Sequence, residues 1–240
     1  MILPLLIFNA RPAAGKSEII DFLRKIPLED RMTRFHIGSM VVLDDFPMLW
    51  AWFEEDSLLR EHFQHPGLHT DSQGYFLYED TLWNLLIRRL SLEYDKWRRD
   101  AQDNQTVVIE FSRGTEHGGY QSAYDHLSDA ILSQAACLYV HVSYEESLRK
   151  NRRRFNPERA DSILEHGLPD EKMERLYSED DWYDLTTADP SYVSVRGFQV
   201  PYMVFDNEDD VTTAGGDALG NRLESTLRRL WTLWKQRSQT

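Results

Sequence analysis

The sequence has little of what several large classes of protein depend on. A single cysteine, Cys137, excludes a disulfide framework and any cysteine-rich metal site. No apolar run is long enough to cross a membrane as a helix, and the apolar run at the start lacks the basic flank of a secretory signal. Basic residues are also in the minority, with 27 Lys and Arg against 40 Asp and Glu and a net charge of −13. Because nucleic acids and anionic membranes favour basic surfaces, we expect neither as a partner. From the lack of a secretory signal and of a membrane span we expect a cytoplasmic location.

The most informative stretch that is present covers residues 2–20, ILPLLIFNARPAAGKSEII. An apolar run of strand length leads into a turn of small residues and then into the start of an amphipathic helix. Residues 10–17, ARPAAGKS, match the pattern GxxxxGK[ST] at every fixed position except the first, where Ala10 replaces glycine. Such a loop curls its backbone N–H groups around a phosphate at the N-terminus of a helix. The pattern therefore predicts a nucleotide-binding loop made of Ala10, Arg11, Pro12, Ala13, Ala14, Gly15, Lys16 and Ser17.

The last three residues of this loop have distinct expected roles. Gly15 leaves room for a close approach of the backbone to phosphate. Lys16 is a point charge suited to the β- and γ-phosphates, and the Ser17 hydroxyl is a suitable ligand for the Mg²⁺ that bridges them. Pro12 lacks an N–H group, which suits a rigid turn but removes one possible donor. ATP and Mg²⁺ are thus the expected cofactors.

The rest of the chain alternates apolar runs with helical patterns, which is typical of a parallel sheet covered by helices. At 240 residues it fits one α/β domain. The further apolar runs are residues 35–43, 106–111, 137–142 and 201–205, and the helical patterns are residues 80–99, 120–132, 143–155 and 218–236. Two segments, residues 46–80 and 156–199, exceed ordinary connection lengths, so we expect functional insertions or lids there.

Charged residues follow two of the expected strands. Asp44 and Asp45 end the second run, and Glu110 ends the third, with Arg113 just beyond it. In open α/β sheets the ligand lies outside the carboxyl ends of the strands. Phosphoryl transfer needs a carboxylate to orient or deprotonate the acceptor hydroxyl and a second one at the metal or its waters. We therefore predict an acceptor-side base at Asp44 or Asp45, a metal-side carboxylate at Glu110, and an acceptor contact at Arg113.

A basic cluster follows the fourth run, in an otherwise acidic chain. Arg149 and Arg153 are four residues apart, so they share a face of the expected helix. Guanidinium groups on that face could stabilise the negative charge that develops on a transferring phosphoryl group. The alternative is a solvated helix surface.

Taken together, ARPAAGKS, LDDF, IEFSR, RKNRRR and VFDNEDD resemble the phosphate-loop kinases of nucleosides, nucleotides and small metabolites. The resemblance implies a three-layer fold with a five-stranded parallel sheet of order 2-3-1-4-5 and helices on both faces. It implies a single domain over residues 1–240, with an acceptor-side insertion at about 46–105 and a lid-like insertion at about 149–199. It also implies that Arg149 and Arg153 are lid arginines and that Asn207 lies near the adenine.

The resemblance favours a kinase acting on a small-molecule hydroxyl or phosphate, with a nucleoside or nucleotide as the first expectation. The first insertion also carries aromatic residues that could stack a base or could simply pack its core, namely Trp50, Trp52, Phe53, Phe63, Tyr75, Phe76 and Tyr78. Two other classes stay open, a nucleotide-dependent ATPase or switch and a nucleotide-binding protein without catalysis. A homodimer is possible. The sequence does not say which acceptor is used.

Overall fold

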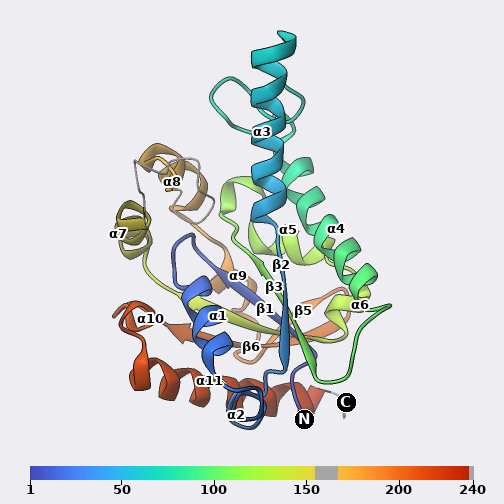
Figure 1. Cartoon of the computed structure of the whole chain (residues 1–240), viewed down its shortest axis with the longest axis vertical. Coiled ribbons are helices and arrows are strands. Elements are labelled where there is room, and N and C mark those ends of the chain that lie inside the picture. The colour runs from blue at the N-terminus through green and yellow to red at the C-terminus, as the bar shows by residue number, and fades with distance from the viewer. Residues whose placement is uncertain (155–166, 238–240) are drawn as a thin grey trace.

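The computed structural model describes residues 1–154 and 167–237, which form a sheet with helices on both faces (Figure 1). The sheet has six strands in the order β2-β3-β1-β4-β6-β5. The strands are β1 (Leu5–Ala10), β2 (Ser39–Asp44), β3 (Gln105–Phe111), β4 (Ala135–His141), β5 (Tyr192–Val195) and β6 (Phe198–Asp206). Strands β2, β3, β1, β4 and β6 are parallel, and their carboxyl ends meet at one edge of the sheet.

The prediction of five parallel strands in the order 2-3-1-4-5 is wrong in strand count and at one edge. The sixth strand, β5, pairs antiparallel with β6, from Tyr192 opposite Pro201 to Val195 opposite Phe198. Arg196 and Gly197 link the two strands and both have positive φ angles, 46° and 86°. This two-residue turn matches the right-handed twist of a hairpin. The sheet is therefore mixed, with its antiparallel strand at the edge.

Two hydrophobic cores lie on opposite faces of the sheet because successive side chains of a strand point to opposite sides. Leu6 and Phe8 of β1 face one core, and Leu5 and Ile7 face the other. The first core is covered by α1 (Lys16–Lys25), α2 (Leu28–Arg34), α10 (Val211–Ala214) and α11 (Gly216–Arg237). The second is covered by α4 (Glu79–Trp97), α5 (Gly119–His126), α6 (Asp129–Leu132) and α9 (Trp182–Leu185).

One predicted helix is divided in the structure. Residues 120–132 form α5 and α6, separated at Leu127 and Ser128. Ser128 begins α6 because its hydroxyl accepts a hydrogen bond from the Ile131 N–H at 3.4 Å, which is a typical N-cap arrangement. Because the Ser128 side chain takes up a backbone N–H group, it favours a new helix start over the continuous helix that the apolar spacing predicts.

The first insertion begins as a long helix, α3 (Phe46–Phe63), which projects away from the sheet (Figure 1). Residues 64–78 return along it to the start of α4. A third, smaller core holds this arm together, formed by Trp52, Phe76, Leu82, Trp83 and Leu86. Across the same edge of the sheet lie η1 (Thr115–His117), α7 (Tyr144–Arg154) and α8 (Asp170–Tyr177).

The predicted lid-like insertion, about 149–199, is described in part. Residues 155–166 lie outside the described residues, and the remainder contains α8, α9, β5 and the start of β6. None of the helices in residues 1–154 and 167–237 combines the length and apolar character that crossing a membrane requires.

Candidate active site

The predicted nucleotide-binding loop joins the end of β1 to the start of α1. Gly15 has a φ of +112°, and a Cβ atom there would lie 2.6 Å from Thr212 Oγ1 and 2.8 Å from Asn207 Nδ2. Only glycine fits such a conformation and such a close approach. Ala10, at the position where the motif has its first glycine, is the last residue of β1 and does not adopt a positive φ. The backbone at Ala10 therefore does not need glycine.

Asn207 lies beneath this loop and is fully buried. Its side-chain amide donates to the Ala14 carbonyl at 2.8 Å and to Thr212 Oγ1 at 2.9 Å, and its own oxygen accepts from the Thr212 N–H. These bonds tie the loop between β6 and α10 to the predicted phosphate loop. Asn207 supports the loop from behind and is not part of the cavity wall described below.

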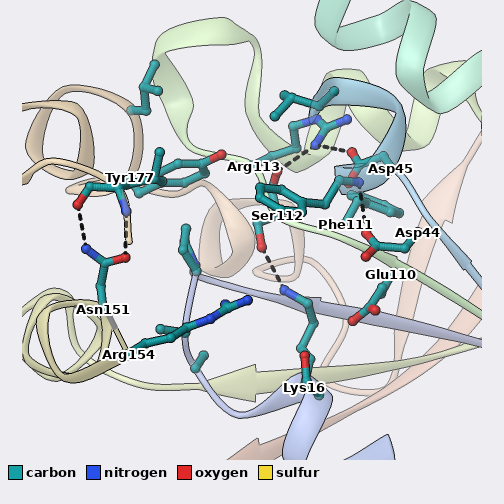
Figure 2. Close-up of a pocket in the computed structure, with 18 of the residues that line it drawn as sticks. Lys16, Asp44, Asp45, Glu110, Phe111, Ser112, Arg113, Asn151, Arg154 and Tyr177 are labelled. Carbon is teal, nitrogen blue, oxygen red and sulfur yellow. Dashed lines mark hydrogen bonds and ion pairs between the residues drawn. The ribbon is translucent and has the colours of Figure 1, made fainter. Parts of the chain in front are cut away.

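Lys16 extends from the start of α1 toward the end of β3. Its ammonium group donates to Ser112 Oγ at 2.7 Å (Figure 2). Burial lowers the pKa of Lys16, while the neighbouring carboxylates of Glu110 and Asp44 work in the opposite direction. Ser112 was not among the predicted site residues, although it lies in the IEFSR motif.

The predicted carboxylates come together at the carboxyl ends of β2 and β3. Asp44 lies directly opposite Glu110 in the parallel pairing of these strands. Burial, together with the charges of Glu110 and Asp45, raises the pKa of Asp44 to about 7. Burial also raises the pKa of Glu110, and the charge of Lys16 opposes this. The site thus concentrates acidic groups around one lysine, as the strand-end rule predicts.

Arg113 reaches the same cluster from the loop after β3. Its guanidinium lies 2.7 Å from Asp45 Oδ2, and both side chains are more than nine-tenths buried. It also donates to the Trp83 carbonyl at 3.2 Å and lies over the Trp83 ring, 4.9 Å from the ring centre. Trp83 belongs to α4, so Arg113 connects the strand end to the arm.

The basic residues of α7 differ in whether they line the cavity described below. Arg149 is paired with Glu146 at 2.6 Å and with Asp210 at 3.1 Å, and it is not part of the cavity wall. Arg153 and Arg154 do line the cavity, although Arg153 also lies 3.6 Å from Asp210. Figure 2 shows Arg154 extending from α7 toward Lys16. Of the two predicted lid arginines, Arg153 is therefore at the site, and Arg154 is a site residue that the helical spacing did not single out.

One cavity of about 610 Å³ connects these groups. At one end it is lined by residues 12–18 of the predicted phosphate loop, and Asp44, Asp45, Glu110 and Arg113 lie beside them. Another part of its wall, called the aromatic end below, is formed by apolar and aromatic side chains of the arm and of α8, namely Phe46, Leu49, Phe53, Tyr75, Phe76, Trp83, Leu176 and Tyr177. Of the seven aromatic residues named from the sequence, Phe53, Tyr75 and Phe76 line the cavity, whereas Trp50, Trp52, Phe63 and Tyr78 do not.

Helix α8 closes the aromatic end. Lys172 donates to the Gly74 carbonyl at 2.9 Å and lies over the rings of Phe53 and Tyr75. Arg175 lies 4.0 Å from the centre of the Tyr75 ring and pairs with Glu116. Burial raises the pKa of Tyr177 to about 12, so its hydroxyl stays protonated at neutral pH.

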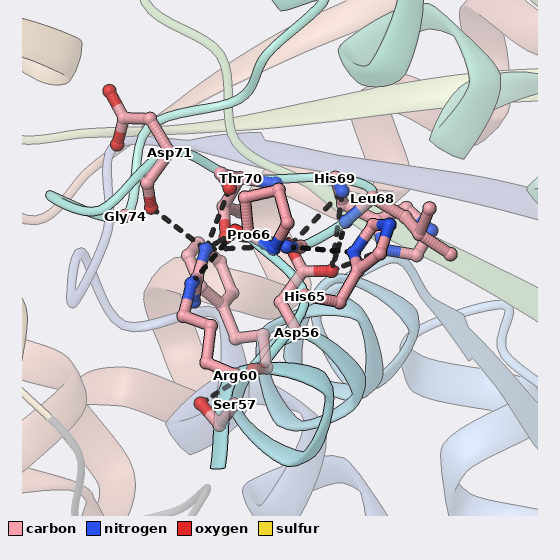
Figure 3. A network of polar contacts seen from close by, with 12 residues as sticks. Asp56, Ser57, Arg60, His65, Pro66, Leu68, His69, Thr70, Asp71 and Gly74 are labelled. Atoms are coloured by element: carbon pink, nitrogen blue, oxygen red, sulfur yellow. Dashed lines mark hydrogen bonds and ion pairs between the residues drawn. The ribbon is translucent and has the colours of Figure 1, made fainter. Parts of the chain in front are cut away.

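The loop that carries Gly74 and Tyr75 is held to α3 by a buried carboxylate (Figure 3). Asp56 accepts hydrogen bonds from the N–H groups of Leu68, His69 and Thr70 and from the Thr70 hydroxyl, at 2.6 to 3.3 Å. Arg60 donates to carbonyl groups of the same loop. This network explains why a loop without regular structure keeps a defined shape.

The described residues contain no group of three or more His, Cys, Asp or Glu side chains able to hold a metal ion. A magnesium ion bound with a nucleotide needs fewer protein ligands, because phosphate oxygens and waters fill most of its six positions. Ser17 lies at the exposed start of α1, and Ser17 and Glu110 both line the cavity. This donor set, one hydroxyl and one carboxylate, fits such an ion.

No protein-family model matches the chain, and no curated protein matches it. Among solved structures, the crystal structure of a gluconokinase from Sinorhizobium meliloti 1021 aligns with 98% of this chain and 97% of its own, at 13% sequence identity and a TM-score of 0.45. The activity and the acceptor are therefore inferred from the residues of the site.

Proposed function

We propose that this chain is an ATP- and Mg²⁺-dependent kinase that transfers a phosphoryl group to a hydroxyl or phosphate group of a small molecule. The observation that supports this proposal is a cavity whose wall combines the glycine-lysine-serine loop, the strand-end carboxylates and aromatic side chains of the arm and α8. Phosphoryl transfer depends on placing two substrates in line and on stabilising charge between them. A cavity with a phosphate end and a separate apolar end suits two substrates.

At the phosphate end, backbone N–H groups at the N-terminus of α1, those of Gly15, Lys16 and Ser17 among them, would bind the phosphates, because the helix dipole favours an anion there. The ammonium of Lys16 would exchange its bond to Ser112 for a phosphate oxygen. Ser17 and Glu110 would hold Mg²⁺, which when bound neutralises charge on the phosphates.

Between the two ends, Asp44 is our choice for the acceptor-side base. A general base works best when its pKa is close to the working pH, and the pKa of Asp44 is raised to about 7. Asp45 is held by Arg113 at 2.7 Å, so it is better suited to orient the acceptor than to take its proton. Arg154 would place a cation at the transferring group from the lid side, and Arg153 would support it.

The acceptor end favours a molecule with a flat, apolar body. Phe53, Phe76 and Trp83 form part of its wall, with Phe76 and Trp83 more than nine-tenths buried in the core of the arm, and Lys172 and Tyr177 contribute polar groups. A polyol buried against these rings would leave hydroxyl groups without partners, at a cost of about 1–3 kcal/mol each. A nucleoside or nucleotide fits this wall better, because the face of its base would lie against the rings while the polar edge of the base and the ribose hydroxyls would turn toward the charged groups of the cavity.

The proposal is tested by measuring ADP release from Mg·ATP, first alone and then with pools of nucleosides, nucleoside monophosphates, sugars and small aromatic alcohols. Stimulation by a nucleoside or aromatic pool, and its loss in Lys16→Ala, is the expected result. If the protein hydrolyses ATP and no pool stimulates the reaction, it is an ATPase or a nucleotide-dependent switch and not a kinase. Absence of ATP binding in the wild-type protein would overturn the proposal altogether.

A further inference from the structure

The side chain of Arg11 belongs to the predicted phosphate loop but points away from the cavity. Its guanidinium donates to the carbonyls of Tyr177 at 3.1 Å, Val142 at 3.2 Å and Ser178 at 3.3 Å, using three different nitrogens. It also lies 2.8 Å from the carboxylate of Asp180. The side chain is only 13% exposed, so these are well-protected contacts.

Two of these acceptors are carbonyls at the carboxyl end of α8. The last carbonyls of a helix have no partner within the helix and carry the negative end of its dipole. The Arg11 guanidinium donates hydrogen bonds to two of these carbonyls, and its positive charge offsets the negative end of the helix dipole. Asp180, the fourth partner of the Arg11 guanidinium, itself accepts hydrogen bonds from the Tyr139 hydroxyl at 3.0 Å and from the Trp182 N–H at 3.1 Å.

Helix α7 also forms a hydrogen bond with the phosphate loop. The Ser147 hydroxyl of α7 donates to the Pro12 carbonyl at 2.7 Å. Asn151 of α7 exchanges two hydrogen bonds with the backbone of Leu168, just before α8. Neighbouring residues of the loop, Arg11 and Pro12, therefore contact the segments on both sides of residues 155–166.

Helix α8 contributes directly to the acceptor end of the cavity. Lys172, Leu176 and Tyr177 are part of the wall, and Lys172 is bonded to the Gly74 carbonyl of the arm. Any shift of α8 would thus change the distance between its side chains and the rings of Phe53 and Tyr75. Arg11 is the side chain that links this helix to the loop at the opposite end of the cavity.

We propose that Arg11 is a positioning residue that couples the phosphate loop to α8, so that nucleotide binding at the loop fixes the acceptor end of the cavity. This inference rests on the proposed nucleotide binding. Arg11 would act through α8 and would not touch the reacting groups. Lysine cannot replace it fully. The three nitrogens of the planar guanidinium each donate to a different carbonyl, and a single ammonium group cannot reach all three.

The test is amide hydrogen exchange, measured by mass spectrometry with and without Mg²⁺ and a non-hydrolysable ATP analogue. In the wild type, the analogue should slow exchange in peptides covering residues 11–20 and also in those covering residues 170–180. In Arg11→Gln, the loop should still be protected, whereas α8 should exchange about tenfold faster and no longer respond to the analogue. Arg11→Lys should lie between the two.

Arg24→Gln is the matched control, since Arg24 also lies in the loop–α1 region and its ion-pair partner there, Asp21, is exposed. It should behave as the wild type. Asp180→Asn, which keeps an oxygen acceptor, should reproduce the loss of coupling in a milder form if Arg11→Gln does not fold. Equal protection of α8 in wild type and Arg11→Gln would overturn the inference. Protection of the loop in neither protein would instead refute nucleotide binding, on which the inference rests.

Discussion

The carboxylate of Asp45 and the guanidinium of Arg113 form a buried ion pair 2.7 Å apart at the junction of the sheet and the arm. Asp45 precedes α3, whereas Arg113 follows β3 and lies over Trp83 of α4. The pair therefore joins the strand ends to both helices of the acceptor-side insertion. Removing one partner of a buried pair leaves the other charge without compensation.

Replacing Arg113 should therefore destabilise the protein. For Arg113→Met we expect a loss of about 3–5 kcal/mol in the free energy of unfolding, measured by urea denaturation. Arg24→Met removes an arginine whose ion pair with Asp21 is more than half exposed, and it should cost less than about 1 kcal/mol. Similar losses in the two variants would mean that the Asp45–Arg113 pair does not hold the arm.

The raised pKa of Asp44 predicts a pH-dependent stability. Because the pKa rises from 3.8 to about 7 on folding, the native state binds this proton more tightly than the unfolded state does. Stability contributed by the neutral form is present below pH 3.8 and is lost as the pH rises to about 7. In metal-free buffer, Asp44→Asn should thus stabilise more at pH 8 than at pH 5, by about 1–2 kcal/mol after allowance for partial solvent screening.

Urea denaturation at the two pH values measures this difference. Asp21→Asn, which alters a mostly exposed carboxylate of α1, is the control and should show no such change between the two values. A gain from Asp44→Asn that is independent of pH would contradict the raised pKa.

The arginines of α7 should separate in kinetic experiments. Arg154→Gln should lower the acceptor-dependent turnover by about 100-fold with little change in ATP affinity, as expected for a contact made in the transition state. Arg149→Gln should lower it by less than about tenfold, because Glu146 and Asp210 already hold that guanidinium at the surface. Arg153→Gln should fall between them. The reverse order would place the lid cation at Arg149.

Asp56 should control the local order of the arm. Burial alone would raise the pKa of Asp56, but hydrogen bonds from Leu68, Thr70 and His69 outweigh it and bring the pKa to about 2. This stabilisation is present above pH 3.8 and is lost as the pH falls toward 2. At neutral pH, Asp56→Ala should speed amide exchange of residues 64–77 at least about tenfold, while the sheet stays protected.

Glu61→Ala is the control for this experiment, because Glu61 is largely exposed on the same helix. Its loop peptides should exchange at the wild-type rate. Unchanged exchange in Asp56→Ala would show that the hydrophobic contacts of Phe76 and Trp83 are enough to order the loop.

Much of the parallel sheet could be predicted because its strands are short apolar runs between turn signals. β1 is buried throughout, and its run LLIFNA reads as a central strand. β5 was missed because Tyr192–Val195 alternates in burial over only four residues. The turn at Arg196 and Gly197 was a usable signal, although Arg-Gly is a weaker hairpin pair than Asn-Gly.

The site could be predicted where strand ends meet the phosphate loop, since topology alone brings Asp44, Glu110 and Lys16 together. The direction in which a side chain points from a helix or loop could not be predicted from the sequence. Arg11 and Arg149 point away from the cavity because carbonyls and carboxylates of α8 and the segment after β6 attract them. Arg154 and Lys172 reach it from elements whose placement depends on tertiary packing.

The central claim is that one cavity brings Mg·ATP and a small acceptor together for phosphoryl transfer. Its most direct test follows the label of γ-³²P-ATP, with Mg²⁺ and the nucleoside and aromatic-alcohol pools, in the wild type and in Lys16→Ala. We predict that the wild type transfers label to an acceptor and that Lys16→Ala does not. Label found only in inorganic phosphate, or remaining in ATP with every pool, would contradict the account.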